Sequence, residues 1–340
     1  MMIPENLQNE ANKIIDLIKK SQKIILTAHL RPDGDAIGSV SGLMKSLKKN
    51  GKKVDVDLLD GVPSRFPFVW PEGHELLKAP EIVSDHNLII VLDCGDAERH
   101  GITFKYDKSK TTLINIDHHA SNVNFGDINY VDTGAQATCE IVTALIEKAG
   151  FPLDTDIAES LMLGLMTDSR TFSNENIRYT THEAAAALLR TGLSVSRILN
   201  TLNCGRKEVD LRIQGFGLSN FKLECDDHLA TLVITKKDLA KFNANVGNIF
   251  ASGIFNIPLT IESVTASVVI FEREDGFSAC EFRSRGGIDV KEVAVALGGG
   301  GHVPASGCSQ QIPIEEMADK AIELMKKQVN NFYNKKNEVQ

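Results

Sequence analysis

The 340-residue sequence lacks several features that would place it in a specialised class of protein. It contains no C-x-x-C pair, and its scattered thiols favour reduced cysteines over a disulfide framework or a zinc ribbon. No uninterrupted apolar run approaches the length of a membrane span, and the N-terminus lacks a basic region followed by a long apolar core. We therefore expect a soluble, cytoplasmic protein. The six cysteines are Cys94, Cys139, Cys204, Cys225, Cys280 and Cys308.

An excess of positive charge is also absent, because the formal net charge is −8. Proteins that bind long nucleic-acid duplexes depend on broad basic surfaces, so this charge argues against a duplex as the main partner. It does not exclude a short anionic substrate that is held by a few local arginines. The composition, 42% hydrophobic and 24% charged, is typical of a soluble protein, and the length suggests roughly two domains.

The sequence does contain a strand, a polar loop and a helix start within residues 24–39, which read I-I-L-T-A-H-L-R-P-D-G-D-A-I-G-S. Ile24–Ala28 predicts a buried strand, and His29, Asp33 and Asp35 follow it in a loop that proline and glycine punctuate. Three such groups would repel one another or lose hydration unless a cation lay among them. The alternative is structural: a loop histidine, a solvated Asp33 and an Asp35 that caps the helix. This stretch alone does not decide between the two.

The pattern of an aliphatic strand that ends in polar side chains occurs twice more. Leu88–Leu92 ends at Asp93, and Thr112–Ile116 ends at the D-H-H sequence 117–119. Alternation of such strands with helices predicts an α/β fold, with a parallel sheet and helices on both faces. In such sheets ligands bind outside the carboxyl ends of the strands, so these side chains should meet at one edge. The predicted helices span residues 5–20, 36–50, 136–149 and 155–167.

The C-terminal half has a different pattern. Residues 180–220 are predicted to be helical, and the tail after residue 333 is expected to fray. We expect a parallel-sheet domain over residues 1–190, a helical connector over 191–224 and a smaller α/β domain over 225–335. The elements predicted beyond the connector are strands 229–235, 263–271 and 277–282 and helices 290–297 and 314–332.

The donors at the predicted sheet edge suit manganese, magnesium or iron better than a structural zinc, because no thiolate is among them. Four or five carboxylates would over-coordinate a single divalent ion. Two ions about 3.5–4 Å apart that share one carboxylate would resolve this and would form a clamp for phosphoryl transfer. The candidate residues are His29, Asp33, Asp35, Asp93, Asp117, His118, His119 and Asp168.

A run of four glycines, Gly298–Gly301, follows the predicted helix 290–297. It is not a P-loop, which would follow a strand and carry G-K-[ST], and no G-x-G-x-x-G follows the first strand. The run could be a flexible helix C-cap, or its backbone N–H groups could approach a phosphate or carboxylate closely. Arg283 and Arg285 favour the second interpretation, because arginine binds phosphate bidentately.

Four motifs together resemble those of the DHH phosphoesterase superfamily: H-L-R-P-D-G-D-A-I-G-S, L-D-C-G-D, D-H-H and, at 166–169, M-T-D-S. F-R-S-R-G-G-I-D-V at 282–290 and G-G-G-G-H-V-P-A-S-G at 298–307 resemble its DHHA1 domain. The subfamily that the sequence resembles most is the bifunctional oligoribonuclease and 3′-phosphoadenosine-5′-phosphate (pAp) phosphatase type. The resemblance implies that residues 1–190 form a catalytic, metal-binding DHH domain and residues 225–335 a substrate-binding DHHA1 domain.

The resemblance also implies roles for single residues. His29 and Asp33 match the ligands of one ion, Asp93 matches a bridging carboxylate, and Asp117 would orient a histidine ring. His119 matches the histidine that faces the scissile phosphate. The ligands of the other ion would be Asp35, His118 and Asp168, and the residues that bind the far end of the substrate would be Arg283, Ser284, Gly299, Gly300, Gly301 and His302, with a lesser role for Arg99.

The implied function is hydrolysis of short oligoribonucleotides, dinucleotides or pAp by in-line attack of hydroxide on phosphorus, with two divalent cations, Mn²⁺ or Mg²⁺, as cofactors. The implied partner is short single-stranded RNA or a small nucleotide, without duplex nucleic acid or membrane, and a homodimer is left open. Two alternatives are an exopolyphosphatase- or pyrophosphatase-like hydrolase and a catalytically silent nucleotide sensor. One departure from the family pattern is Arg170, where many relatives carry glycine or another small residue, so the shape of that turn is open.

Overall fold

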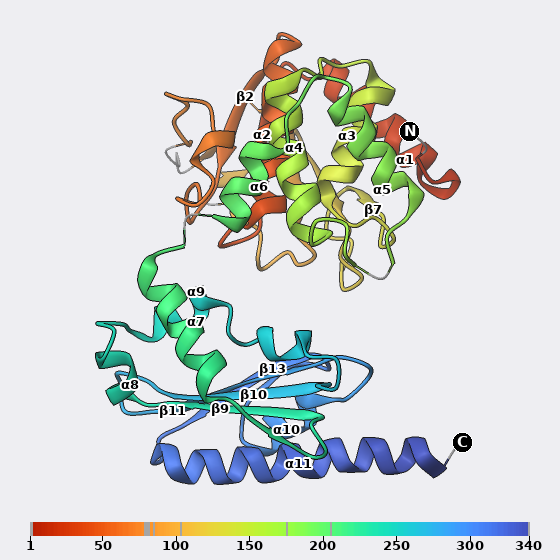
Figure 1. Ribbon diagram of the computed structural model, residues 1–340. Coiled ribbons are helices and arrows are strands. Elements are labelled where there is room, and N and C mark those ends of the chain that lie inside the picture. Colours follow the sequence, from red (N-terminus) through yellow and green to blue (C-terminus); the bar gives the residue numbers. More distant parts are fainter. Residues whose placement is uncertain are drawn as a thin grey trace. The chain divides into compact units, whose positions relative to one another are not determined.

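The computed structural model describes residues 3–77, 82–83, 86–102, 104–174, 176–204 and 206–338 (Figure 1). The chain divides into two compact units, Met1–Cys204 and Gly205–Gln340. The residues predicted as a connector fall in both units, because α6 (Ser196–Asn203) belongs to the first and α7 (Glu208–Asn220) to the second. None of the helices in the described part of the chain is both long and apolar enough to span a membrane.

The N-terminal unit is built on a five-stranded parallel sheet of order β2-β1-β4-β6-β7. This confirms the predicted α/β class. The strand β7 was not predicted, because its four residues, I-N-Y-V, are too short and too polar to form an aliphatic run. The strands are β1 (Lys23–Ala28), β2 (Lys53–Asp57), β4 (Leu88–Leu92), β6 (Thr112–Asp117) and β7 (Ile128–Val131), and a separate two-stranded ribbon pairs β3 (Ile82–Val83) with β5 (Lys105–Tyr106).

The helices of this unit cover one face of the sheet, where alternate strand residues such as Leu26 and Ile90 share a core with them. On the opposite face, Ile25, Ile89 and Val91 pack against Phe104 and other residues outside helices. Among the described residues no helical side chain joins that second cluster. In this part of the chain the helices therefore cover one face of the sheet, whereas we expected them on both. The helices are α1 (Gln8–Lys20), α2 (Gly34–Lys49), α3 (Thr138–Ala149), α4 (Thr155–Asp168), α5 (Tyr179–Leu189) and α6, with 3₁₀ turns η1 (Glu5–Leu7) and η2 (Pro67–Val69).

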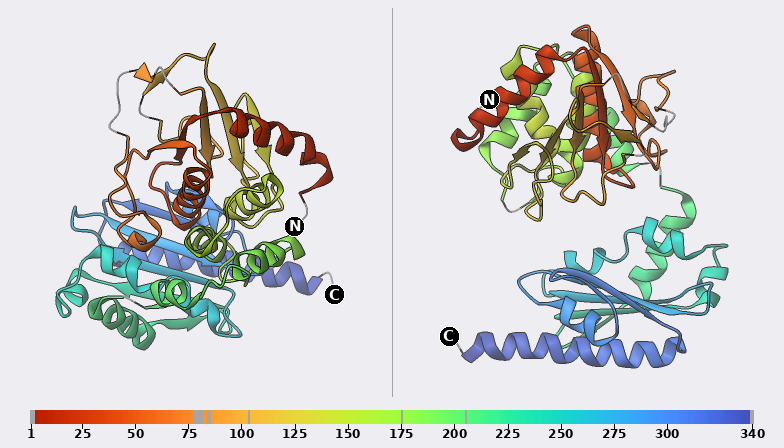
Figure 2. Two further views of the ribbon diagram at one scale, coloured as in Figure 1. Left: turned by 90° about the horizontal axis from the view of Figure 1, so that it is seen from above. Right: turned by 180° about the vertical axis from the view of Figure 1, so that it is seen from behind.

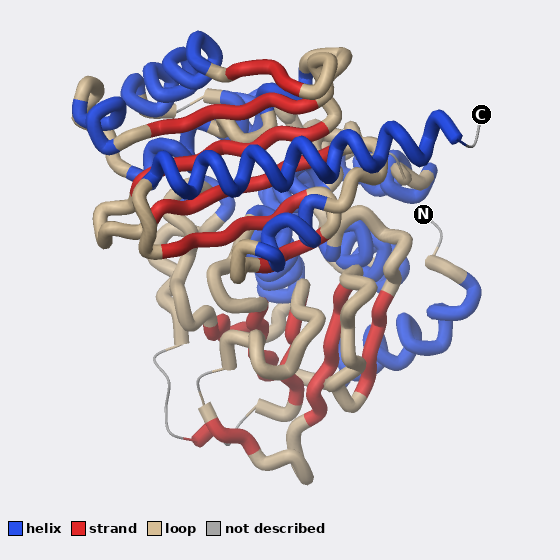
Figure 3. Tube along the Cα trace, turned by 90° about the horizontal axis from the view of Figure 1, so that it is seen from below, coloured by secondary structure: helices blue, strands red, loops and turns tan. Residues whose placement is uncertain are grey.

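The C-terminal unit has a six-stranded mixed sheet of order β12-β13-β11-β10-β9-β8. Its two faces bury separate apolar clusters: α7 and α9 (Val246–Ser252) pack on one face, and α10 (Val290–Ala296) and α11 (Ile314–Glu338) on the other. Figure 2 shows both layers, and Figure 3 shows α11 lying over the face of the sheet, roughly along the direction of the strands. The remaining elements are β8 (Lys222–Glu224), β9 (Leu229–Ile234), β10 (Ala266–Glu272), β11 (Ser278–Ser284), β12 (Gly300–His302), β13 (Ala305–Gln310), α8 (Lys236–Ala240) and η3 (Ile257–Thr260).

In this unit the structure bears on one alternative that was left open and contradicts one expectation. Gly300–His302 forms the edge strand β12, paired with β13, so the glycine run is more than a flexible helix C-cap. The tail after residue 333 does not fray at once, because α11 continues to Glu338. Phe332 and Tyr333 hold this end by packing on the core, and the Tyr333 ring stacks on His228 at 4.0 Å between centroids.

Candidate metal centre

The polar side chains predicted to meet at one sheet edge do meet there. His29 follows β1, Asp93 follows β4, and residues 117–119 end β6 and follow it, and these three strands are parallel neighbours. The first turn of α2 adds Asp35, and Asp168 is the last residue of α4. The structure thereby brings together residues that lie up to 139 positions apart in the chain, which short-range structure alone could not do.

Asp93 links two groups of ligand atoms, one around His29 and one around His118, and His119 lies beside it in a third group. In one group, His29 Nε2 lies 3.5 Å from Asp93 Oδ2 and 3.8 Å from Asp33 Oδ1. In the other, His118 Nε2 lies 3.5 Å from Asp168 Oδ2 and 3.9 Å from Asp35 Oδ2. The second oxygen of Asp93, Oδ1, is 3.5 Å from His118 Nε2. One carboxylate therefore presents a different oxygen to each group.

The second ring nitrogen of His29 and of His118, Nδ1, lies close to a backbone carbonyl oxygen in each case. His29 Nδ1 is 2.8 Å from the carbonyl oxygen of Leu30, and His118 Nδ1 is 3.3 Å from that of Ala135. A ring that donates from Nδ1 keeps the lone pair on Nε2, which is how a metal-binding histidine is commonly oriented. His118 Nε2 is buried and has no hydrogen-bond partner. A buried ring nitrogen that faces carboxylates and has no hydrogen-bond partner is suited to bind a divalent cation.

Asp35 is completely buried, and the first turn of α3 stabilises its charge. The backbone N–H groups of Thr138 and Cys139 donate to Asp35 Oδ2 and Oδ1, at 2.5 and 2.9 Å. The Thr138 hydroxyl lies 3.1 Å from Asp93 Oδ1. The residue that caps α2 is Asp33, whose Oδ1 accepts from the N–H groups of Asp35 and Ala36, so the structural alternative named the wrong aspartate as the cap.

The backbone of α4 approaches Asp35 through a glycine. A Cβ atom placed on Gly164 would lie 2.6 Å from Asp35 Oδ1 and 2.3 Å from Cys139 Sγ. No side chain fits there without displacing the carboxylate. Asp93 carries a different constraint, a left-handed backbone with φ of +55°, which costs on the order of 1 kcal/mol and is characteristic of functional sites.

In the absence of a cation, burial and mutual repulsion strongly shift the pKa values of the carboxyl groups. Burial, with the neighbouring Asp93, raises the pKa of Asp35 to about 7. Burial and the charges of Asp35 and Asp93 raise the pKa of Asp168 to about 9. Burial would also raise the pKa of Asp93, but the adjacent His118 and His29 hold it well below its usual range. Protons thus occupy part of this site when it holds no cation.

The pKa values of His29 and His118 are raised, whereas burial alone would lower the pKa of an imidazole. Burial alone would lower the pKa of His29, but Asp33 and Asp93 outweigh it and raise the pKa to about 10. The same balance, with Asp93 and Asp35 as the neighbouring acids, raises the pKa of His118 to about 10. Both rings must lose a proton before Nε2 can bind a metal.

His119 lies beside this cluster, and Asp117 orients it. Asp117 Oδ1 is 2.7 Å from His119 Nδ1. Asp117 Oδ2 accepts from Asn122 Nδ2 at 2.6 Å, and the same amide donates to Asn115 Oδ1 at 2.8 Å. The hydrogen bond to Asp117, against a smaller effect of burial, raises the pKa of His119. Asp117 therefore contacts His119 rather than the ring of His118.

The 46%-exposed His119 side chain lines a pocket of about 300 Å³. Its walls also include His29, Asp93 and Arg99, so the predicted arginine opens on the same space as one of the two ligand groups. Sequence reasoning missed Asn122 and Thr138. Asn122 stands three residues after D-H-H and Thr138 opens α3, but their contacts depend on the folded chain.

The turn after α4 accommodates Arg170. Arg170, Thr171 and Phe172 all have left-handed φ values, of +49°, +56° and +63°. Asn174 Nδ2 donates to the carbonyl oxygen of Asp168 at 2.8 Å and closes this turn. The exposed Arg170 side chain does not displace Asp168 from the cluster.

Two family models match the chain. The model of the DHH family, N-terminal domain, matches residues 23–165, and the model of the DHHA1 domain matches residues 231–331. The chain therefore combines an N-terminal domain of the DHH family with a DHHA1 domain.

Similar proteins with curated names span nearly the whole DHH/DHHA1 chain. The bifunctional oligoribonuclease and PAP phosphatase NrnA of Thermus thermophilus is 29% identical over 308 residues, which cover 90% of each chain. The protein of the same name from Bacillus subtilis is 29% identical over 87% of this chain and 92% of its own. Among solved structures, an exopolyphosphatase-related protein from Bacteroides fragilis matches with a TM-score of 0.79, at 25% identity and 96% coverage of both chains.

The DHHA1 region contains the residues predicted to bind substrate. Arg283 Nη1 pairs with Glu281 Oε2 at 2.8 Å, and the Ser284 hydroxyl donates to the carbonyl oxygen of Ile288. A Cβ atom on Gly299 would lie 2.1 Å from the carbonyl oxygen of Gly307, so close strand packing already requires glycine there. His302 is exposed on β12. The substrate contacts of these residues, and of Gly300 and Gly301, stay predictions.

Proposed function

We propose that this DHH/DHHA1 protein is a metal-dependent phosphoesterase that hydrolyses short oligoribonucleotides, dinucleotides or pAp. The observation that supports it is the pair of ligand groups that Asp93 links, with His118 Nε2, which has no hydrogen-bond partner, between carboxylates. The names of the Thermus thermophilus and Bacillus subtilis relatives favour these substrates. The oxygen and imidazole donor set favours Mn²⁺, with Mg²⁺ as the alternative.

The proposed ligands are His29 and Asp33 for one ion and Asp35, His118 and Asp168 for the other, with Asp93 between them. Divalent ions bound there would supply acidification of water and positive charge opposite a phosphoryl group. The protein's own groups complete the site. Asp117 fixes the His119 ring through Nδ1, which leaves Nε2 to hydrogen-bond a phosphoryl or leaving oxygen, and Arg99 binds a phosphate in the same pocket.

A second candidate is hydrolysis of inorganic polyphosphate or pyrophosphate, which the likeness to the exopolyphosphatase-related protein of Bacteroides fragilis favours. The products separate the two functions. A dinucleotide gives nucleoside monophosphates, whereas polyphosphate gives orthophosphate. A catalytically silent sensor would release neither.

The test is a panel of di- to penta-ribonucleotides, pAp, a cyclic dinucleotide and polyphosphate, each with added Mn²⁺. We expect turnover of dinucleotides or pAp, and a loss in Asp93→Asn that exceeds the roughly 100-fold effect of removing an outer partner of a metal ligand. The control is Asp16→Asn on the exposed side of α1. Turnover by Asp93→Asn equal to that of the control would contradict the two-ion site, and release of orthophosphate from polyphosphate alone would favour the second candidate.

A further inference from the structure

The loop that joins β7 to α3, residues 132–137, supports two of the proposed metal ligands (Figure 1). The carbonyl oxygen of Ala135 in this loop lies 3.3 Å from His118 Nδ1. Where the loop enters α3, the N–H group of Thr138 donates to Asp35 Oδ2 at 2.5 Å. Both ligands belong to the same proposed ion, so a displacement of this loop would move both of them.

A side-chain amide connects the same loop to Asp168, the third ligand of that ion. Asn174 Nδ2 donates to the carbonyl oxygen of Asp168 at 2.8 Å and to Gln136 Oε1 at 3.0 Å. Gln136 belongs to the loop, and its Nε2 donates to the carbonyl oxygen of Asn176 at 2.9 Å. The loop is therefore bonded to the turn that follows α4, where Asp168 ends the helix.

The ligands of the other proposed ion are supported by their own stretch of chain. His29 Nδ1 lies 2.8 Å from the carbonyl oxygen of the next residue, Leu30, and Asp33 accepts the N–H groups that begin α2. In the part of the chain that the structure describes, neither His29 nor Asp33 hydrogen-bonds to residues 132–137. The two ions thus differ in what positions their ligands.

Two acids with little exposure fix the loop, and one arginine lies close to both. Asp132 Oδ1 accepts from the N–H group of Gly134 at 3.1 Å, and Asp132 Oδ2 accepts from Arg178 Nη2 at 2.7 Å. Glu140 Oε2 accepts from the N–H group of Gln136 at 3.0 Å. The same Nη2 atom of Arg178 lies 3.7 Å from Glu140 Oε1. The side chains of Asp132 and Glu140 are 11% and 5% exposed.

The loop also packs directly on the guanidinium group. A Cβ atom on Gly134 would lie 2.5 Å from Arg178 Nη1 and 2.8 Å from its Cζ, so no side chain fits between them. Glu140 also accepts from two threonine hydroxyls of α5, so its charge has other support. Asp132 depends more on Arg178. Without the guanidinium, two poorly hydrated carboxylates would repel each other at the base of the loop.

We propose that Arg178 is a positioning residue for the ion of Asp35, His118 and Asp168. It balances the charge of Asp132 and backs Gly134, and so it fixes the loop that orients these ligands. It contacts none of them itself. The inference rests on the proposed function and deepens it, because it makes the affinities of the two ions separately adjustable. The ion of His29 and Asp33 does not depend on Arg178.

The test measures Mn²⁺ binding by calorimetry at pH 8 in two backgrounds of the full-length protein, each of which lacks one ligand. His29→Ala leaves the His118 group intact, and His118→Ala leaves the His29 group intact. In the His29→Ala background we expect Arg178→Met, which removes the charge but keeps the apolar stem, to weaken Mn²⁺ binding by roughly tenfold or more, as loss of an outer partner of a metal ligand does. In the His118→Ala background it should leave Mn²⁺ affinity unchanged.

A conservative variant and a matched control accompany this test. Arg178→Lys should retain most of the Mn²⁺ affinity, because a single nitrogen of Arg178 lies near both acids and an ammonium group can replace it. Arg197→Met removes another arginine of the same unit, 61% exposed, whose Nη1 lies 3.5 Å from Glu159 Oε2. This control should change Mn²⁺ affinity in neither background.

An equal loss of Mn²⁺ affinity in the two backgrounds would overturn the proposal, because a general structural defect acts on both ions, and so would no loss in either. If Arg178→Met does not fold, Asp132→Asn decides. It keeps an oxygen for the N–H group of Gly134 but removes the charge that pairs with Arg178, so it should weaken Mn²⁺ binding in the His29→Ala background alone. Because this assay measures binding without turnover, its failure is distinct from that of the proposed function, which the Asp93→Asn assay tests.

Discussion

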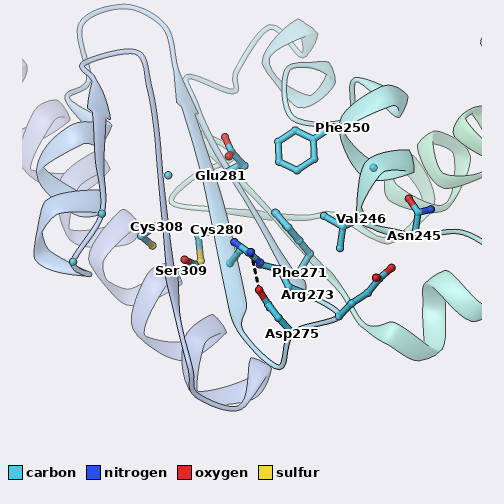
Figure 4. A pocket seen from close by; sticks show the side chains of 16 residues that line it. Asn245, Val246, Phe250, Phe271, Arg273, Asp275, Cys280, Glu281, Cys308 and Ser309 are labelled. Atoms are coloured by element: carbon cyan, nitrogen blue, oxygen red, sulfur yellow. Dashed lines mark hydrogen bonds and ion pairs between the residues drawn. The ribbon is translucent and has the colours of Figure 1, made fainter. Parts of the chain in front are cut away.

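The two units hold their charged groups in different ways. At the sheet edge of the N-terminal unit, the buried Asp93 lies 3.5 Å from the buried Nε2 atom of His118, among further acids, and this nitrogen has no hydrogen-bond partner. Around a pocket of the C-terminal unit (Figure 4), Arg273 pairs with Asp275 and Arg283 with Glu281, and the lining includes exposed aromatic surface. Buried, incompletely paired charges require a compensating ion, whereas paired ones do not.

This comparison leads to different expectations for the two units. The N-terminal unit should depend on metal ions and on the protons that compete with them. Changes at the sheet edge are therefore expected to alter metal affinity and kcat. Changes around the paired charges of the C-terminal unit are expected to leave metal affinity unaltered.

The largest effect is expected from pH. Asp35 and Asp168, with pKa values raised by burial to about 7 and about 9, and His29 and His118, raised to about 10, carry protons below those values. An ion must displace them, so Mn²⁺ affinity should rise with pH, about tenfold per unit for each proton released. Between pH 6 and 8 this gives about a hundredfold increase for one proton, measurable by calorimetry.

The control is His228→Gln in the C-terminal unit, whose Nδ1 contacts the carbonyl oxygen of Ser263. It should leave the slope of affinity against pH unchanged. An Mn²⁺ affinity that is constant from pH 6 to 8 would show that the ion does not displace protons from these groups, and the difference between the two units would lose its basis.

The next effect concerns Asn122, whose amide fixes Asp117 and through it His119. We expect Asn122→Ala to lower kcat for a dinucleotide by about 10- to 100-fold, as for other residues that orient a functional side chain through a hydrogen bond. Mn²⁺ affinity should not change, because Asn122 contacts none of the proposed ligands. Asn9→Ala on the exposed side of α1 is the control. A parallel loss of Mn²⁺ affinity and kcat would assign Asn122 a structural role instead.

Short-range patterns were sufficient to predict where the chemistry-bearing residues meet. The aliphatic run Leu88–Leu92 must be buried, and the chain can place Asp93 only at the end of that strand. Because neighbouring strands are parallel, the same argument places the residues after β1 and β6 at the same edge.

Contacts between distant residues could not be predicted in this way. The N–H group of Thr138 donates to Asp35 across 103 positions, and β12 forms by pairing with β13, where Gly300 lies opposite Gly307. Phe250 belongs to no motif, and its contacts with the rings of Phe255 and Phe271 depend on the folded chain. The polar groups at the sheet edge have a local signature in the sequence, whereas contacts among residues from separate elements have none.

The smallest expected effect is on the free energy of unfolding, when one glycine in each unit is replaced by alanine. Gly164→Ala would place a methyl group 2.6 Å from Asp35 Oδ1, so we expect it to lower the free energy of unfolding by about 1–3 kcal/mol, as overpacking does. Gly215→Ala on α7 meets no atom within 4 Å, so we expect it to raise that free energy by about 0.5–1 kcal/mol through helix propensity. Urea denaturation measures both. Because the methyl group also displaces a proposed ligand, Gly164→Ala alone should weaken Mn²⁺ binding, and equal Mn²⁺ affinity in the two variants would show that the position of Asp35 does not matter to the metal.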